Sequence, residues 1–469
     1  MTLPYTTSMP SELYNELQSN LASLLVRAGV DTARRLRELN YPLAVDERQI
    51  LVTGREKDLN GWSSSEVIIK QSVLHRQSVP LYRVSPLLSP DSVSAARDCA
   101  RRIVDLPESQ LPFFSPFQGN AGYLISDSAE ATYPGYKSDP VEWTLRHLLL
   151  PALLENLAKS IKPQKISSAT ARNFAVEVLE VAMADDMKYR LTVPIAGIKV
   201  ASTVATADGK VAFRRLSPSE QGSLLTSWGL ASMNFGTVLP ATALELLIST
   251  GRSAQNPDVR ELVATWYCAL LLCGYDVGGY RATVEQLPNW VLPFGPMNMP
   301  TPLPMRMGSV NWTSLSPSKL GKLMETVGRL ARYSISDPRS ERDLALHRFS
   351  SGAARSNHVD GILDFVIALE SLLLPYDEDA RRGDLGYRFR LHGAHYLSKT
   401  KSERSIIAKK LTDLYSLRSR LVHGGKYPSA AEIQTGWNSA RQLAQIGLGR
   451  AVAEGFPSAV QFKAKLLGS

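Results

Sequence analysis

Residues 404–423 read RSIIAKKLTDLYSLRSRLVH, and their pattern indicates how the C-terminal part of the chain folds. Its apolar residues gather on one side of a helical wheel, as they do in an amphipathic helix that packs against neighbours. Gly424 and Gly425 follow directly, and glycine is a natural residue at the end of a helix. The sequence therefore predicts a helix over residues 402–423 with one face in a hydrophobic core.

One cation breaks this amphipathic pattern. Arg418 lies at about 320° on a wheel that starts at Arg404, inside an apolar arc that runs from about 280° to about 20°. A guanidinium in such a position is unfavourable unless it is paired or faces a cavity. Lys409 and Arg420 lie on the opposite, polar side of the same wheel. The apolar arc is formed by Ile407, Leu411, Leu414, Tyr415 and Val422.

A second apolar helix, predicted over residues 359–374 (VDGILDFVIALESLLL), carries one misplaced anion. Glu370 falls on an apolar face of the wheel, whereas Asp364 falls on a narrow polar edge. The fork of an arginine matches a carboxylate in a bidentate pair, so we expect Glu370 to meet Arg418. The pair could take part in function. The alternative is that it is an internal salt bridge that only fixes the register of the two helices.

His423 stands at the end of the predicted helix, five residues after Arg418. An imidazole beside a fixed cation is suited to acid–base chemistry on a phosphate ester. Five residues correspond to about 140° around a helix, so the two side chains do not share one face. The alternative role for His423 is that of a plain helix cap.

Helical periodicity extends over the rest of the C-terminal part, and Gly or Pro separates most of the periodic segments. Such a series of helices is typical of a helical bundle, which we place at residues 318–469. Residues 286–317 are rich in Pro and Met, and we interpret them as an extended connector because proline disfavours helix and central strand. A long loop inside one domain is the alternative. The predicted bundle helices are 318–333, 339–350, 357–374, 384–398, 402–423 and 429–453.

Residues 1–285 are predicted to form a mixed α/β region that senses or binds something. The fold class is therefore α+β overall, with this mixed region followed by an all-α bundle. Asp31 is placed to cap a following helix, and the Asp-Gly pair within residues 206–210 favours a hairpin turn. Ser217 and Glu220 have the spacing of a capping box. The predicted elements are helices at 11–27, 31–39, 141–160 and 257–274, and strands at 48–53, 65–74, 189–203 and 209–215.

The composition excludes several classes of protein. The chain has 469 residues, of which 44% are hydrophobic and 21% charged, as in ordinary globular proteins. Its apolar runs are far shorter than the ~20 residues of a membrane helix, and no secretory signal is visible, so we expect a cytoplasmic protein without membrane contact. The three cysteines form no CxxC pair, which suits a reducing compartment and provides no zinc set. We expect no cofactor and no metal.

The net charge of +9 is unevenly distributed along the chain. Residues 341–469 contain 19 Lys and Arg against 13 Asp and Glu, whereas the first 340 residues contain 34 against 31. A basic C-terminal part is compatible with a phosphate-bearing partner, and a solvated surface is the alternative. His392 and His395 lie three positions apart, but no third ligand follows at a familiar spacing, so a core or surface pair is favoured over a metal site.

The segment Arg418–His423 resembles the R-x(4–6)-H motif of the HEPN superfamily, in which a small polar residue such as Ser419 commonly follows the arginine. The upstream sequence resembles the Apea-like HEPN branch, which has a repeated Arg-Phe, an Asp-rich turn and an ALE-L-L helix. The resemblance covers about residues 340–450, a quarter of the chain. Its further features here are His347-Arg348-Phe349, Arg355, Asp360, the segment 364–370, Leu414-Tyr415 and Gly424.

This resemblance implies a bundle that forms a homodimer and acts as a metal-independent endoribonuclease in bacterial toxin or antiviral defence systems. His423 would transfer protons, Arg418 would stabilise charge on the scissile phosphate, and Glu370 would orient Arg418. The RNA products would carry 2′,3′-cyclic phosphate and 5′-hydroxyl ends. The other expected site residues are Ser419, Tyr415 and Asp364 as support, and Arg420, Lys426 and Lys409 as RNA-binding residues.

A catalytically silent HEPN-like module for dimerisation or scaffolding, with an N-terminal binding domain, is the alternative function. In that case, replacing Arg418 damages folding and replacing His423 changes little. A toxin-like protein controlled by an activating or inhibiting protein partner is a third possibility.

Overall fold

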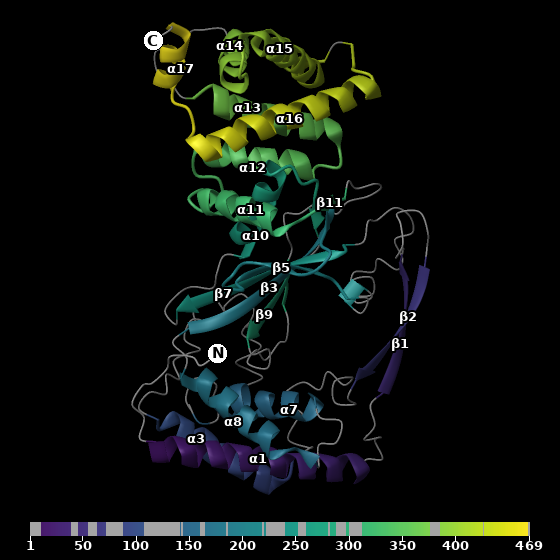
Figure 1. The fold of residues 1–469 in the computed structure, drawn as a ribbon, viewed down its shortest axis with the longest axis vertical. Coiled ribbons are helices and arrows are strands. Elements are labelled where there is room, and N and C mark those ends of the chain that lie inside the picture. Colours follow the sequence, from purple (N-terminus) through teal and green to yellow (C-terminus); the bar gives the residue numbers. More distant parts are fainter. Residues whose placement is uncertain are drawn as a thin grey trace.

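The computed structural model has an α+β fold in which a helical C-terminal region lies on an antiparallel sheet (Figure 1). This confirms the predicted fold class. A second group of helices, from the N-terminal part of the chain, lies on the other side of the sheet in Figure 1. The structure describes residues 11–38, 46–54, 63–71, 88–106, 141, 144–159, 165–183, 186–217, 220–221, 240–251, 259–279, 282–287, 297–299, 312–375, 385–424 and 426–467.

The helices of the C-terminal region begin and end within a few residues of their predicted limits. Thr400 and Ser429 open two of them with capping boxes, in which the cap hydroxyl and the third helical residue, Glu403 or Glu432, exchange hydrogen bonds. One further helix, α17, has no predicted counterpart. The helices are α11 (Pro317–Leu330), α12 (Glu341–Ala354), α13 (His358–Leu373), α14 (Leu385–Leu397), α15 (Lys401–His423), α16 (Ala430–Glu454) and α17 (Ala459–Leu467).

A seven-stranded antiparallel sheet lies beneath this bundle in Figure 1. Its strand order is β10-β9-β3-β7-β6-β5, and β8 pairs with the end of β3. Leu191, Val193 and Ile195 of β3 are buried at every second position on one face, as expected for a strand. The strands are β3 (Asp186–Ala196), β5 (Val204–Ala205), β6 (Val211–Arg215), β7 (Thr242–Gly251), β8 (Gly278–Gly279), β9 (Ala282–Leu287) and β10 (Met297–Met299).

The hairpin turn and the capping box that the sequence predicts both form in this region. The predicted hairpin joins β5 to β6: the backbone N–H of Thr206 donates to Val211 O at 2.9 Å, and Gly209 takes a φ of 67°. The capping box also forms, because Ser217 N–H donates to Glu220 at 2.8 Å and Glu220 N–H donates to Ser217 Oγ at 3.2 Å.

The Pro-rich segment supplies two short strands. β10 is the edge strand beside β9, and β11 (Thr313–Ser314) pairs in parallel with β4 (Ile198–Lys199). Edge positions tolerate a Pro-rich sequence because proline lacks the N–H that a central strand needs. The other residues of 288–311 lie outside the described residues.

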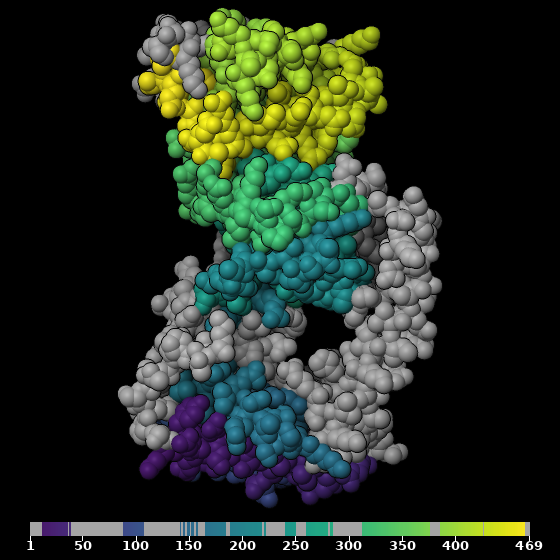
Figure 2. Space-filling view, viewed as in Figure 1, coloured from purple at the N-terminus to yellow at the C-terminus, as the bar shows by residue number. Residues whose placement is uncertain are grey.

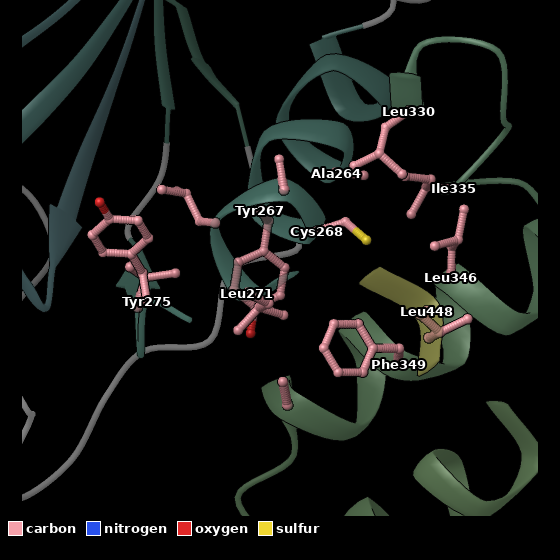
Figure 3. Close-up of a cluster of buried hydrophobic side chains, with 14 of the residues drawn as sticks. Ala264, Tyr267, Cys268, Leu271, Tyr275, Leu330, Ile335, Leu346, Phe349 and Leu448 are labelled. Carbon is pink, nitrogen blue, oxygen red and sulfur yellow. The ribbon is translucent and has the colours of Figure 1, made fainter. Parts of the chain in front are cut away.

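Helix α10 (Val259–Leu272) joins the sheet to the bundle. After its first turn, which holds Arg260 and Glu261, its sequence is apolar on all sides, and residues 263–271 are all buried. Trp266 makes an edge contact with Phe213 of the sheet, with the ring centroids 6.1 Å apart. Cys268 lies among apolar side chains of the bundle (Figure 3). The sheet and the bundle therefore share one hydrophobic core, and they appear as one continuous body in Figure 2.

A separate core holds the N-terminal helices together. Residues 11–38 form one continuous helix, so the prediction of two helices with Asp31 as a cap is wrong. Asp31 lies inside this helix and accepts hydrogen bonds from Ser89 and Ser92 at the start of α3, so its carboxylate is used by a different helix. The elements are α1 (Ser11–Glu38), α3 (Pro90–Val104), η5 (Leu145–Leu149), α7 (Leu150–Lys159), α8 (Ser168–Met183) and the antiparallel hairpin of β1 (Asp46–Gly54) and β2 (Ser63–Gln71).

The boundary between the two cores falls between α8 and β3. This boundary is earlier in the chain than the Pro-rich segment. What residues 1–285 sense or bind stays a prediction. None of the described helices is long and apolar enough to cross a membrane.

Candidate active site

The arginine of the R-x4-H segment lies half-buried on α15, beside the buried face of that helix. Leu411, Leu414 and Leu417 form the buried centre of this face. Arg418 thus borders the core, as its position on the wheel predicts. Val422 was expected in the same apolar arc, but it is 49% exposed, so the buried face is turned toward Leu417.

A glycine on α16 accommodates Leu417 on this face. A side-chain atom of Leu417 occupies the place where a Cβ at Gly436 would stand. Gly436 therefore leaves open the space that Leu417 fills. On the other flank of α15, the ring of Tyr415 contacts Phe389 of α14, with the centroids 5.8 Å apart. Tyr415 therefore fixes α15 against α14.

Glu370 of α13 interacts electrostatically with Arg418, but the two side chains do not form the predicted bidentate pair. Among the described residues, neither side chain has an ion pair or a hydrogen bond. Burial raises the pKa of Glu370 above its usual value, and the nearby charge of Arg418 opposes this rise only in part. A half-buried carboxylate and a half-buried guanidinium thus both keep hydrogen-bonding capacity that no described residue uses.

Glu370→Gln is expected to raise the free energy of unfolding at pH 7.5. The raised pKa means that folding favours the protonated carboxyl, so this contribution is complete below the unfolded value of 4.5 and is lost as the pH rises through the folded pKa. Above the unfolded pKa the half-buried carboxyl therefore lowers stability, and an amide, which stays neutral, removes that penalty. Urea unfolding of both proteins at several pH values should show a gain that shrinks toward pH 4.5.

The exposed Glu341 of α12 provides the control for this experiment, since Glu341→Gln should give no comparable gain. A loss of stability in Glu370→Gln at pH 7.5 would contradict the prediction and would show that attraction to Arg418 outweighs desolvation.

His423 is the last residue of α15, and its side chain is exposed. Gly424 follows with a φ of 83°, which agrees with the predicted helix end. Val422 and Tyr427 near it are 49% and 67% exposed. The end of α15 therefore presents an imidazole to solvent with apolar side chains close to it in sequence.

The residues expected to bind RNA have different surroundings. Lys409 and Lys426 are exposed, whereas Arg420 donates to Glu432 at 3.1 Å. The Arg420 and Glu432 side chains are 34% and 51% exposed, and pairs of this kind contribute little, so Arg420 can exchange Glu432 for a phosphate. Ser419, which lies between Arg418 and Arg420 in the sequence, is half-buried.

Asp364 belongs to a different cluster. Its carboxylate accepts hydrogen bonds from Arg348 at 2.8 Å and from Arg355 at 2.9 Å, and only 4% of its side chain is exposed. Asp364 lies on the polar edge of α13 that the wheel predicts, and α12 covers this edge and supplies the paired cations. Seven residues separate the two arginines, which places them on one face, and this spacing is the signal that could have predicted the cluster.

His392 is a core histidine, as favoured by the sequence. Its Nδ1 lies 2.7 Å from Leu373 O, its ring stacks on Phe462 with centroids 4.3 Å apart, and burial lowers its pKa. Within the described parts of the chain, no three His, Cys, Asp or Glu side chains gather as the ligands of a metal would.

Comparison of the chain with known proteins identifies no similar protein. The resemblance to the HEPN superfamily therefore rests on the residues quoted in the sequence analysis, and it stays a prediction. No protein-family model matches the chain, and neither a curated protein nor a solved structure matches it.

Proposed function

We propose that the C-terminal bundle is a metal-independent endoribonuclease of a bacterial defence or toxin-type system and acts in the cytoplasm. One observation carries this proposal: α15 holds a half-buried Arg418 near the half-buried Glu370, and it ends in the exposed His423. The described residues leave the guanidinium free to bind a phosphate. An exposed imidazole on the same helix supplies proton transfer.

The reaction follows from these groups. The ribose 2′-oxygen attacks the adjacent phosphorus while the bond from phosphorus to the 5′-oxygen breaks. His423 accepts the proton of the 2′-hydroxyl or donates a proton to the leaving 5′-oxygen, and Arg418 stabilises the charge that develops on the phosphate oxygens. The products are a 2′,3′-cyclic phosphate and a 5′-hydroxyl. Because the nucleophile is part of the RNA, proximity supplies much of the rate.

The proposed active unit is a homodimer. Arg418 and His423 are about 140° apart around one helix and about 7.5 Å apart along it, so one helix does not aim both at one phosphate. Two copies of α15 related by a two-fold axis place the arginine of one beside the histidine of the other. The exposed Val422 and Tyr427 offer apolar surface for this contact.

The exposed Lys409 and Lys426, together with Arg420, extend the basic surface that would hold the RNA backbone. In this proposal, residues 1–285 serve as the sensor, and an activating or inhibiting protein partner controls when RNA is cleaved.

A mixture of Arg418→Ala and His423→Ala proteins is expected to regain cleavage that each protein lacks alone. Random exchange makes half of the dimers mixed, and each mixed dimer has one complete site of two, so about a quarter of the wild-type rate should return. The measurement is cleavage of end-labelled RNA in the presence of EDTA, with both new ends identified chemically.

Two outcomes of this experiment would count against the proposal. If the mixture stays as inactive as its components while the wild type cleaves, the site does not cross the dimer. If the wild type cleaves no RNA, or if its products carry 5′-phosphates, the proposed reaction is wrong.

A further inference from the structure

A cavity of about 520 Å³ lies where α10, the segment after α11 and helix α12 meet. This volume is within the range of natural small-molecule sites. In Figure 1, α12 lies on the sheet side of the bundle and α15 lies on its far side, so the cavity is separate from the R-x4-H segment. Its polar lining consists of Arg260, Ser336, His347, Ser350, Ser351 and Arg355.

The charged groups at this cavity leave positive charge available to a ligand. Arg260 is exposed and has no ion pair among the described residues. Arg355 binds Asp364 through its Nε atom at 2.9 Å, which leaves its Nη hydrogens for another acceptor. Asp364 is shared with Arg348, so this carboxylate already serves two cations. The charge of Asp360 also acts on Arg355, but Asp360 accepts no hydrogen bond from it.

One wall of the cavity is held in place before any ligand binds. The carboxylate of Glu261 accepts hydrogen bonds from Ile335 N–H at 2.6 Å and from the N–H and hydroxyl of Ser336 at 2.8 and 2.6 Å. His347 Nδ1 lies 2.8 Å from the carbonyl oxygen of Ile335. Because a carbonyl only accepts, Nδ1 carries the proton and Nε2 is the nitrogen left for a ligand.

A buried hydroxyl also lines the cavity. Ser350 is 8% exposed, and among the described residues its Oγ has no hydrogen-bond partner apart from the thiol of Cys268. The nearby thiol of Cys268 is a poor partner, because burial raises its pKa to about 12 and the sulfur stays neutral. A buried hydroxyl without a strong partner is unfavourable, and an oxygen of a ligand would satisfy it.

We propose that this cavity binds a phosphate-bearing small molecule of nucleotide size. Arg260 and Arg355 engage the phosphate, and Ser350 bonds a further oxygen of the ligand. The inference goes beyond the proposed nuclease, since neither Arg418 nor His423 takes part. The rest of the ligand lies against the apolar part of the wall, formed by Ala264, Tyr267, Ile335 and Ala354 (Figure 3 shows the first three).

The test is titration calorimetry of the full chain with AMP, GMP, CMP, UMP and inorganic phosphate, and with the four matching nucleosides. At least one nucleotide is expected to bind in the micromolar range, and its nucleoside is expected not to bind. Arg260→Gln should weaken binding at least about tenfold, because it removes a charge-assisted hydrogen bond. Arg342→Gln is the matched control, since Arg342 is an exposed arginine of α12 outside the cavity lining.

A second variant separates this site from the R-x4-H segment. The Arg418→Ala protein should bind the same nucleotide with unchanged affinity, whether or not the wild type cleaves RNA. The proposal is overturned if neither phosphate nor any nucleotide binds the wild type. It is also overturned if binding survives Arg260→Gln and Ser350→Ala but is lost in Arg418→Ala, because the nucleotide then occupies the other site.

Discussion

His423→Ala is expected to lower the rate of RNA cleavage by about 10²–10⁴-fold, which is the usual contribution of a general acid or base. The same change should leave the fold intact. The histidine is exposed at the last residue of α15, and Gly424 ends the helix whichever residue precedes it. The free energy of unfolding should therefore stay within about 0.5 kcal/mol of the wild type, as for other surface substitutions.

Induced expression in a bacterial host measures this effect directly, with growth and total RNA integrity followed at matched protein levels. The wild type should arrest growth and leave RNA fragments with 5′-hydroxyl ends, and His423→Ala should do neither. Lys401→Ala, an exposed change at the opposite end of α15, should behave as the wild type. Identical growth and intact RNA in all three strains would instead favour the silent scaffold, for which His423 has no role.

The largest loss of stability is expected from the double variant Arg348→Gln, Arg355→Gln. Asp364 is almost fully buried, and these two arginines are its ion-pair partners. Removing both leaves a buried carboxylate without a counter-ion, which costs about 3–5 kcal/mol. Either single variant should lose less, because the remaining arginine still neutralises the charge.

Urea unfolding of the full chain, with hydrogen exchange of α12 and α13 followed in parallel, measures this loss and locates it. Adding Asp364→Asn to the double variant should restore a large part of the stability, because no buried charge is then stranded. The exposed Arg342→Gln change on α12 should have little effect. A double variant as stable as the wild type would show that water already solvates Asp364.

Much of the fold is predictable from the sequence, and the reason is physical. A helix depends on a period of 3.6 residues and on caps at its two ends, all of which lie close together in the chain. Helices α15 and α16 begin within one residue of their predicted limits, at the caps Thr400 and Ser429, and Gly424 ends α15 as predicted. The prediction at Asp31 is wrong because the partners of this residue are distant in sequence. A carboxylate that can cap a helix can also accept hydrogen bonds from another segment, here from Ser92.

The candidate site shows where prediction from the sequence ends. The position of Arg418 beside the core follows from the wheel, because each residue turns the helix by a fixed angle. The wheel does not show the distance between helices, so it did not reveal that Glu370 and Arg418 lie near each other without an ion pair. The cavity beside α10 was also invisible, since its lining comes from three separated segments.

The α+β class, the limits of the bundle helices and the place of the arginine and the histidine on their helix all follow from the order of the residues. The side-chain contacts become visible only in the folded chain: Asp364 meets Arg348 and Arg355, and Leu417 meets Gly436. Elements form through interactions between residues that are close in the chain. Contacts between elements depend on the rotation and approach of whole helices, which many residues distant in sequence set together.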